Sequence, residues 1–195
     1  MLLEYPAAFP GPFTLFLARH GQPDRSRYDL PYHLPPGPQL TEKGQQEAAE
    51  LGEFLHAQQA AHFMASPLER AWRTAAIAAR ACDAPLEMSQ DLAEWRPEEN
   101  ETTVLGRMQR AIAAGVRLAQ AKAAPVVLVT HGGPIMAALK WLGVPAGTVE
   151  RYRIFDGRNP LPTAGAWRVD NINGELRAQL VFAPQGVVIP VEITV

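Results

Sequence analysis

Short apolar runs alternate with longer amphipathic segments along most of the chain. Residues 13–18 and 125–130 are rich in β-branched and aromatic side chains. The first run is followed by Arg19-His20-Gly21, and the second is followed directly by His131-Gly132. Both patterns predict buried strands that end in loops, and residues 62–65 predict a third, shorter strand. The segment 22–40 contains five prolines. That density predicts a long loop rather than regular structure.

The amphipathic segments predict helices with recognisable beginnings. Thr41 precedes apolar residues at helical spacing, so we expect its hydroxyl to cap a helix. A second helix is predicted from Ser66 to about Cys82. Its serine would be the cap, Pro67 would occupy the first helical position, and Glu69 would complete a capping box.

The second half of the chain continues the alternation and ends in a hairpin. Apolar residues between 105 and 119 predict an amphipathic helix, and Pro134 opens another helix that closes near Gly143. Residues 166–172 and 175–182 flank an Asn-Gly pair, which is typical of a tight β-hairpin.

Strands that alternate with helices favour an α/β fold. We expect a three-layer α/β/α architecture with a mainly parallel central sheet, to which the C-terminal hairpin adds an antiparallel edge. The length of 195 residues fits a single domain spanning 1–195.

Composition narrows the classes of partner. Lysine plus arginine number 18 and aspartate plus glutamate 20, which gives a net charge of −2. This balance provides no long-range attraction to nucleic acid or to anionic membrane, so we expect neither as a partner. No run of about 18 apolar residues predicts a transmembrane helix. Residues 1–6 lack the basic start of a signal peptide, and the single cysteine, Cys82, reads as a small apolar residue. We therefore expect a cytoplasmic protein.

Three polar clusters follow predicted strands: Arg19-His20-Gly21, residues 66–70, and His131-Gly132-Gly133. In open α/β sheets ligands bind beyond the carboxyl ends of the strands, so these clusters can meet in one crevice. Arg70 lies in the first turn of its helix, where free amides and the helix dipole also favour an anion. Two arginines and two histidines together predict a site for a phosphoryl group.

The same three motifs carry a family resemblance. A strand followed by Arg-His-Gly, then Ser-Pro-Leu-x-Arg-Ala-x-x-Thr over residues 66–74, then a strand followed by Thr-His-Gly-Gly resembles the histidine phosphatase superfamily, also called phosphoglycerate mutase-like. The resemblance implies a phosphatase that uses neither cofactor nor metal. It implies the following roles: His20 as nucleophile; Arg19, Arg70, His131 and the adjoining Gly132 as phosphate-binding residues, with His131 also catalytic; and Glu94 as proton donor.

Two departures from the family pattern are visible. Gln22-Pro23-Asp24 follows the first motif, and Ser26 stands about where the family often has an asparagine that contacts phosphate. The family often has a glycine after the acidic glutamate, whereas Trp95 follows Glu94 here. Glu98 is therefore the second candidate for the acid. Neighbouring arginines would keep the imidazole of the nucleophile uncharged, and a desolvated carboxyl beside tryptophan could hold a proton.

Other readings stay open beside the phosphatase. A phosphoglycerate mutase-type phosphoryl transferase and a non-catalytic phosphate-binding scaffold are the alternatives, whereas an acyl hydrolase lacks a Gly-x-Ser-x-Gly serine. His33, His56 and His62 have neither an HExxH motif nor a cysteine partner, so we expect no metal site. The arginines of the Arg151-Tyr152-Arg153 stretch, expected in a loop, could reach an outer anion of the substrate.

The expected partner is a small phosphorylated metabolite or a phosphoprotein, including one that carries phosphohistidine. The proline-rich loop 22–40 and the segment around Trp95 should sit over the crevice and set specificity. A terminal strand with an exposed edge would allow a homodimer.

Overall fold

A computed structural model describes residues 9, 11–27 and 29–189. The N-terminal hexapeptide in which we expect no targeting signal lies outside these residues. Within this described part of the chain, six strands form one sheet in the order β3-β2-β4-β1-β5-β6. The strands are β1 (Phe13–Arg19), β2 (His62–Ala65), β3 (Leu86–Met88), β4 (Val126–Thr130), β5 (Ala166–Ile172) and β6 (Glu175–Phe182).

Strand directions confirm the predicted mixed sheet. β1, β2, β3 and β4 pair in parallel, whereas β5 pairs antiparallel to β1 and β6 antiparallel to β5. The predicted hairpin turns at Asn173 and Gly174, both of which have positive φ (54° and 84°), as a two-residue turn of this kind requires. The predicted α/β class with an antiparallel C-terminal edge is thus confirmed.

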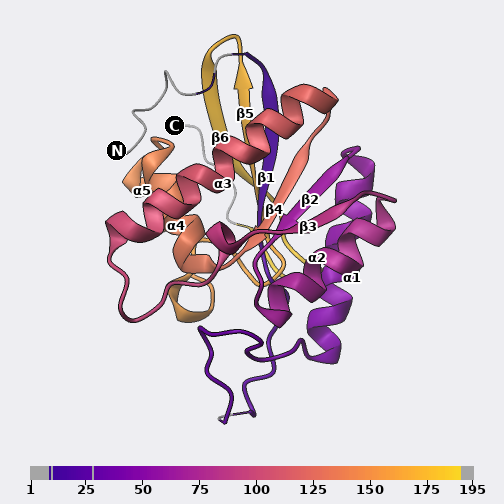
Figure 1. Ribbon diagram of the computed structural model, residues 1–195, viewed down its shortest axis with the longest axis vertical. Coiled ribbons are helices and arrows are strands. Elements are labelled where there is room, and N and C mark those ends of the chain that lie inside the picture. Colours follow the sequence, from indigo (N-terminus) through magenta and orange to yellow (C-terminus); the bar gives the residue numbers. More distant parts are fainter. Residues whose placement is uncertain (1–8, 10, 28, 190–195) are drawn as a thin grey trace.

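Helices cover both faces of the sheet (Figure 1). They are α1 (Glu42–Ala57), α2 (Glu69–Ala81), α3 (Glu101–Lys122), α4 (Gly132–Trp141) and α5 (Ala146–Tyr152). α1 and α2 pack on one face, against Phe16 and Val127, while α3, α4 and α5 pack on the other, against Leu15 and Leu128. Neighbouring residues of β1 and β4 therefore serve opposite cores, because successive strand side chains point to opposite faces.

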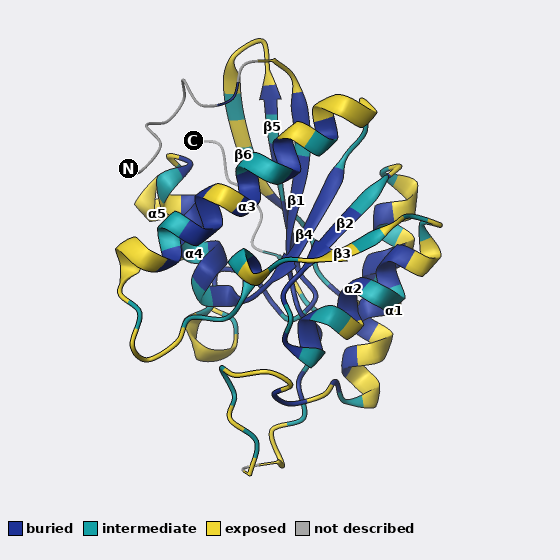
Figure 2. Ribbon diagram, viewed as in Figure 1, coloured by how far each residue is buried: buried dark blue, intermediate teal, exposed yellow. Residues whose placement is uncertain are grey.

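The central strands are buried on both sides, which explains their continuous apolar sequence. All five residues of β4 and all but one of β1 are buried, and Figure 2 shows these strands as the dark centre of the molecule. The loop between Gln22 and Leu40 extends beyond the carboxyl ends of these strands, at the foot of Figure 1. It forms no helix or strand among its described residues, as its prolines predict.

The sequence correctly predicts how α1 begins, but not how α2 begins. Thr41 caps α1 as expected, because its Oγ1 accepts a hydrogen bond from Gly44 N at 2.9 Å. The predicted cap at Ser66 is wrong. α2 begins at Glu69 with Leu68 as its N-cap residue, so Pro67 precedes the helix and no capping box forms.

The physical reason is that the serine has another partner. Ser66 Oγ lies 2.8 Å from His131 Nε2 and accepts a longer bond of 3.3 Å from Leu68 N. The Glu69 amide donates instead to Pro36 O at 2.8 Å, in the proline-rich loop. The Pro36 carbonyl therefore accepts the amide hydrogen bond that the sequence pattern predicted for the serine hydroxyl.

Two smaller expectations about helices need correction. The helix predicted to open at Pro134 begins two residues earlier, at Gly132. The stretch around Arg151, expected to be a loop, belongs largely to α5, and Arg153 is held by Glu150 at 3.0 Å and by the Arg158 carbonyl. Within the described residues, no helix combines the length and apolarity needed to cross a membrane.

Candidate active site

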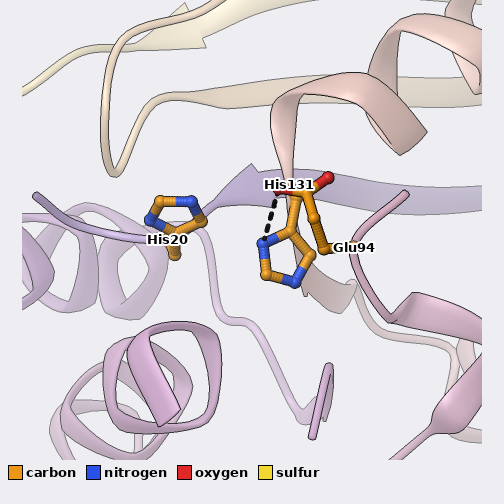
Figure 3. A group of neighbouring side chains, drawn as sticks. All are labelled: His20, Glu94 and His131. Atoms are coloured by element: carbon orange, nitrogen blue, oxygen red, sulfur yellow. Dashed lines mark ion pairs between the residues drawn. The ribbon is translucent and has the colours of Figure 1, made fainter. Parts of the chain in front are cut away.

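His20 and His131 meet because β1 and β4 are adjacent parallel strands. Arg19 is paired with Thr130 across the two strands, so the next residue of each chain segment is a histidine at the same edge. The His20 amide donates to Thr130 O at 3.1 Å, and the two imidazole centroids lie 5.1 Å apart. Figure 3 shows both rings beside Glu94. Two of the three predicted clusters thus converge, as expected.

His20 is held in one defined protonation arrangement. Its side chain is buried, and Nδ1 lies 2.7 Å from Gly21 O. A carbonyl oxygen can only accept, so Nδ1 carries the proton and the neutral ring keeps its lone pair on Nε2. Burial, and then the charges of Arg70 and Arg19, hold the pKa of His20 well below its usual 6.5.

The loop after His20 is fixed by its main chain. Gly21 N donates to Thr74 Oγ1 at 2.9 Å, and Gln22 N donates to Glu47 Oε2 at 2.8 Å. A Cβ on Gly21 would collide with the carbonyl oxygen of Gly44, in the first turn of α1. Gly21 is therefore required because two backbones approach closely here.

Arg70 is fully buried and joins the proline-rich loop to the site. Its Nη1 donates to Tyr32 O at 2.8 Å, and its guanidinium carbon lies 4.0 Å from the centroid of the Tyr32 ring. Its Nη2 lies 3.4 Å from Glu94 Oε2. Burial lowers the pKa of Arg70 from its usual value, but a guanidinium keeps its charge over the whole physiological range.

His131 lies between a hydroxyl and a carboxylate. Ser66 Oγ is 2.8 Å from its Nε2, and Glu94 Oε2 is 3.5 Å from its Nδ1, the contact drawn as a dashed line in Figure 3. Burial, followed by the charges of Arg70 and His20, holds the pKa of His131 well below 6.5. Both rings of the site are therefore neutral at pH 7.

The structure separates the two candidate acids. Glu94 lies in the cluster, with its side chain 15% exposed, and its Oε1 accepts a hydrogen bond from Trp95 N at 2.9 Å. Glu98 is 66% exposed and pairs with Arg96 at 3.5 Å, away from the histidines. Of the two, Glu94 has the position from which a group bound at His20 can be reached.

Arg19 has a partner that the sequence did not reveal. Its two terminal nitrogens donate to the two carboxylate oxygens of Asp156 at 2.7 and 2.8 Å, and one of them also reaches Leu161 O. These hydrogen bonds lower the pKa of Asp156 from its usual value. Asp156 lies in a short 3-10 helix (Asp156–Arg158) 137 residues after Arg19, and no motif marks it.

Gly132 begins α4 directly after His131. A Cβ at this position would overlap the side-chain amide of Asn159, so a larger residue here would force that side chain to move. Asn159 is a second neighbour of the site that the sequence analysis missed. Its amide donates to the Asp156 carbonyl, so the same short segment packs against both Arg19 and Gly132.

Several singled-out residues lie outside this cluster. The Ser26 hydroxyl donates to Asp24 Oδ1 at 2.7 Å on the surface, so it does not occupy an asparagine-like position in the site. His33 and His62 are partly buried and His56 is exposed, each on a different part of the fold. Burial raises the pKa of the Cys82 thiol to about 11, which agrees with its interpretation as an unreactive residue.

In the described residues, one group of side chains could hold a metal ion. His20, Glu94 and His131 each offer one ligand atom, and these atoms lie within 4.8 Å of one another. Two histidines and one glutamate form a familiar zinc ligand set. However, Arg70 lies 3.4 Å from the same glutamate oxygen, and its positive charge opposes a bound cation. The arrangement suits an anion better.

Solved structures share this fold. A mycobacterial glucosyl-3-phosphoglycerate phosphatase is 20% identical with a TM-score of 0.67, and the match covers 87% of this chain and 98% of that one. A phosphoglycerate mutase from Bacillus anthracis is 15% identical with a TM-score of 0.70, covering 90% and 95%. A phosphoserine phosphatase from Entamoeba histolytica is 16% identical with a TM-score of 0.62, covering 88% and 98%. At such identities the likeness establishes the fold.

Sequence comparison supplies the family. No curated protein matches the chain. The family model of the histidine phosphatase superfamily (branch 1) matches residues 15–104, a range that includes His20, Arg70 and Glu94. The resemblance predicted from the motifs is therefore confirmed over residues 15–104, which include the first two of the three motifs.

Proposed function

We propose that this protein is a phosphatase that hydrolyses phosphomonoesters through a phosphohistidine on Nε2 of His20. The observation that carries the proposal is a neutral, buried imidazole with its lone pair on Nε2, close to two arginines that each keep an N–H group without an acceptor. Among the described residues, six buried side-chain atoms have no hydrogen-bond partner, and two of them are Arg19 Nε and Arg70 Nε. A phosphoryl group brings the oxygen acceptors that such donors need.

The first half of the reaction forms a nitrogen–phosphorus bond. The Nε2 lone pair of His20 attacks phosphorus, and the bond from phosphorus to the ester oxygen breaks. Glu94 gives its proton to the departing alkoxide. The phosphorylated ring gains positive charge, which the Gly21 carbonyl stabilises through the Nδ1–H bond.

The second half reverses the proton transfer. Glu94, now a carboxylate, removes a proton from water as that water attacks the phosphohistidine. Inorganic phosphate leaves, and His20 returns to its neutral form. Throughout, Arg70 and His131 bind the phosphoryl oxygens and stabilise the charge that spreads over them in the transition state. Arg19 adds positive charge close to His20, and its Nε keeps a free N–H group while Asp156 holds its terminal nitrogens.

The substrate class that we propose is a small phosphorylated metabolite or a phosphohistidine-bearing protein. The fold is shared with phosphatases and with a phosphoglycerate mutase. We favour hydrolysis because two of the three solved structures named above are phosphatases by name. Release of inorganic phosphate from a panel of phosphorylated metabolites would identify the substrate, whereas isomerised ester without free phosphate would indicate a mutase.

The decisive experiment traps the phosphoenzyme. Rapid acid-free quenching after mixing with ³²P-labelled substrate should leave label on the protein that survives alkali and is lost in acid, as expected for a phosphoramidate. His20→Ala should abolish both the label and turnover. Vanadate and inorganic phosphate should compete with substrate.

The matched control is His56→Ala, which removes an exposed histidine of α1, outside the cluster, and should leave labelling unchanged. Label that persists in His20→Ala would move the nucleophile to another residue, with His131 the first to test. Binding of phosphate without any turnover or label would instead support the non-catalytic scaffold.

A further inference from the structure

The segment that carries Glu94 has little regular structure of its own. After the short 3-10 helix Gln90–Leu92, residues 93–100 form neither strand nor helix before α3 begins. The carbonyl oxygens of four successive residues, from Asp91 to Glu94, accept hydrogen bonds from side chains of other elements. Thr130 supplies one of these bonds, to Leu92 O at 2.6 Å, and a single arginine supplies the other three.

That arginine is Arg107, in the second turn of α3. Its Nη1 donates to Asp91 O and Ala93 O, both at 3.0 Å, and its Nη2 donates to Glu94 O at 3.4 Å. A guanidinium has five N–H groups in a fixed plane, and here the remaining two face one carboxylate. The side chain is 9% exposed, so water offers these carbonyls little alternative.

Glu99 completes the arrangement. Its carboxylate accepts from Arg107 Nε at 2.7 Å and from Nη2 at 2.8 Å, and these bonds, together with the Arg96 amide and charge, lower the pKa of Glu99 to about 2. The Glu99 carbonyl also accepts the indole N–H of Trp95 at 3.0 Å. Arg107 and Glu99 together therefore fix the main chain on both sides of Glu94.

We propose that the Arg107–Glu99 pair positions the general acid of this site, holding the Glu94 carboxyl next to His131 and within reach of the leaving group. This inference rests on the proposed phosphatase mechanism. Arg107 contacts neither substrate nor reacting atoms, because all five of its donors are engaged by protein oxygens. It is a positioning residue, and its effect must pass through Glu94.

The first test is Arg107→Lys, which keeps the positive charge beside Glu99 but offers three donors to five acceptors. Turnover of an alkyl phosphate, whose leaving group needs a proton, should fall roughly tenfold or more, since small displacements of catalytic groups are costly. Turnover of 4-nitrophenyl phosphate, whose leaving group needs little protonation, should change by less than about threefold. An equal loss on both substrates would overturn the proposal, because a merely structural role affects both alike.

A double variant sharpens this test. If Arg107 acts through Glu94, then adding Arg107→Lys to Glu94→Gln should cause no further loss on the alkyl phosphate. Multiplicative losses would contradict the proposal. The matched control is Arg110→Lys, on the next turn of α3, because Arg110 is exposed and bonds the side chain of Asp91 rather than main-chain carbonyls. It should leave the ratio of the two rates unchanged.

A readout independent of activity separates this inference from the mechanism on which it rests. The Trp95 amide donates to Glu94 Oε1, so its hydrogen exchange reports directly on the position of that carboxyl. Arg107→Lys and Glu99→Gln should both speed exchange at Trp95, while the Ala18 amide in buried β1 stays protected. Unchanged exchange at Trp95 would overturn the positioning role. Faster exchange in a protein that forms no phosphoenzyme would refute the mechanism and leave the positioning intact.

Discussion

The two halves of the candidate site are built in different ways. His20 and His131 stand at the ends of adjacent central strands, where the ladder between β1 and β4 and the bond from His20 N to Thr130 O determine their separation. Glu94 stands on an irregular segment whose carbonyls are bonded by the side chains of Arg107 and Thr130. The nucleophile half thus inherits the rigidity of the sheet, whereas the acid half depends on a few side chains. Substitutions should therefore affect the two halves differently.

The largest effect that separates the halves is expected for Glu94→Gln. The variant keeps the shape of the side chain but has no proton to give, so turnover of alkyl phosphates should fall by roughly a hundredfold or more. Turnover of 4-nitrophenyl phosphate should fall much less, and phosphoenzyme formation from it should continue. Steady-state rates on both substrates measure this.

Glu98→Gln is the control for that variant, because Glu98 is exposed on the same segment. It should behave like the parent protein on both substrates. Equal losses on the two substrates in Glu94→Gln would reject Glu94 as the acid and return the assignment to Glu98.

A smaller effect is expected for Thr74, because its side chain holds the loop that follows His20. Thr74→Val preserves the shape but removes the acceptor of the buried Gly21 N–H and the donor to Arg70 O. Leaving such groups unpaired should lower the free energy of unfolding by about 1–3 kcal/mol, measured by urea denaturation. Thr102→Val, exposed on α3, is the control and should change it by less than about 0.5 kcal/mol. No loss in Thr74→Val would mean that the strand ends alone hold the loop.

Acid should weaken the nucleophile half first. Burial and the nearby arginines hold the pKa values of His20 and His131 well below 6.5, so in the window just below pH 6.5 the unfolded chain binds more protons than the folded one. Stability should therefore fall as the pH falls through this window, by at most about 1.4 kcal/mol per unit for each histidine. Urea denaturation between pH 7.5 and 5.5, in a buffer without phosphate, measures the slope.

His131→Asn should reduce that slope, since one of the two shifted groups is gone. The carboxylates whose pKa is lowered, including Glu99 and Asp156, lose their contribution only at more acidic pH and do not obscure the window. A slope that does not change in the variant would mean that His131 titrates normally in the folded protein.

The smallest effect is expected on removal of metals. Activity on 4-nitrophenyl phosphate should persist in excess EDTA, because Arg70 and Arg19 supply the positive charge that a metal ion would otherwise provide. Loss of activity with recovery on adding Zn²⁺ would show that His20, Glu94 and His131 act as ligands. In that case an ion would tie the two halves together, and the contrast between them would no longer hold.

The same contrast explains how far the sequence could predict this molecule. Strand ends are visible in a sequence because an apolar run stops at a polar motif, and so the predicted convergence of His20, Arg70 and His131 is found in the structure. Side-chain bonds to distant carbonyls leave no such pattern, which is why Arg107 was missed. Asp156 was missed because its partner Arg19 lies 137 residues earlier in the chain, and a side-chain pair so far apart leaves no local pattern either.

The error at Ser66 shows the opposite situation. A Ser-Pro-x-Glu pattern is a strong local signal for a helix beginning, and it was read as one. The hydroxyl instead bonds His131, 65 residues later, because the fold brings the end of β2 beside the end of β4. A local sequence pattern predicts bonds between residues that are close in the sequence. At this site, a bond to a residue far along the chain replaces the local one.

The closed base of the proline-rich loop has a consequence for how substrate range can change. Thr41 N donates to Gln22 O, Asp24 N donates to Gln39 O, and Pro23 bridges Leu40, so the loop leaves and re-enters the fold at one tied junction. Such a loop is an exchangeable module: its length and sequence can vary while the junction, and with it His20, stays in place. Exchange would still replace the carbonyl that Tyr32 offers to Arg70. A new module must therefore bring its own acceptor for that arginine along with its new specificity.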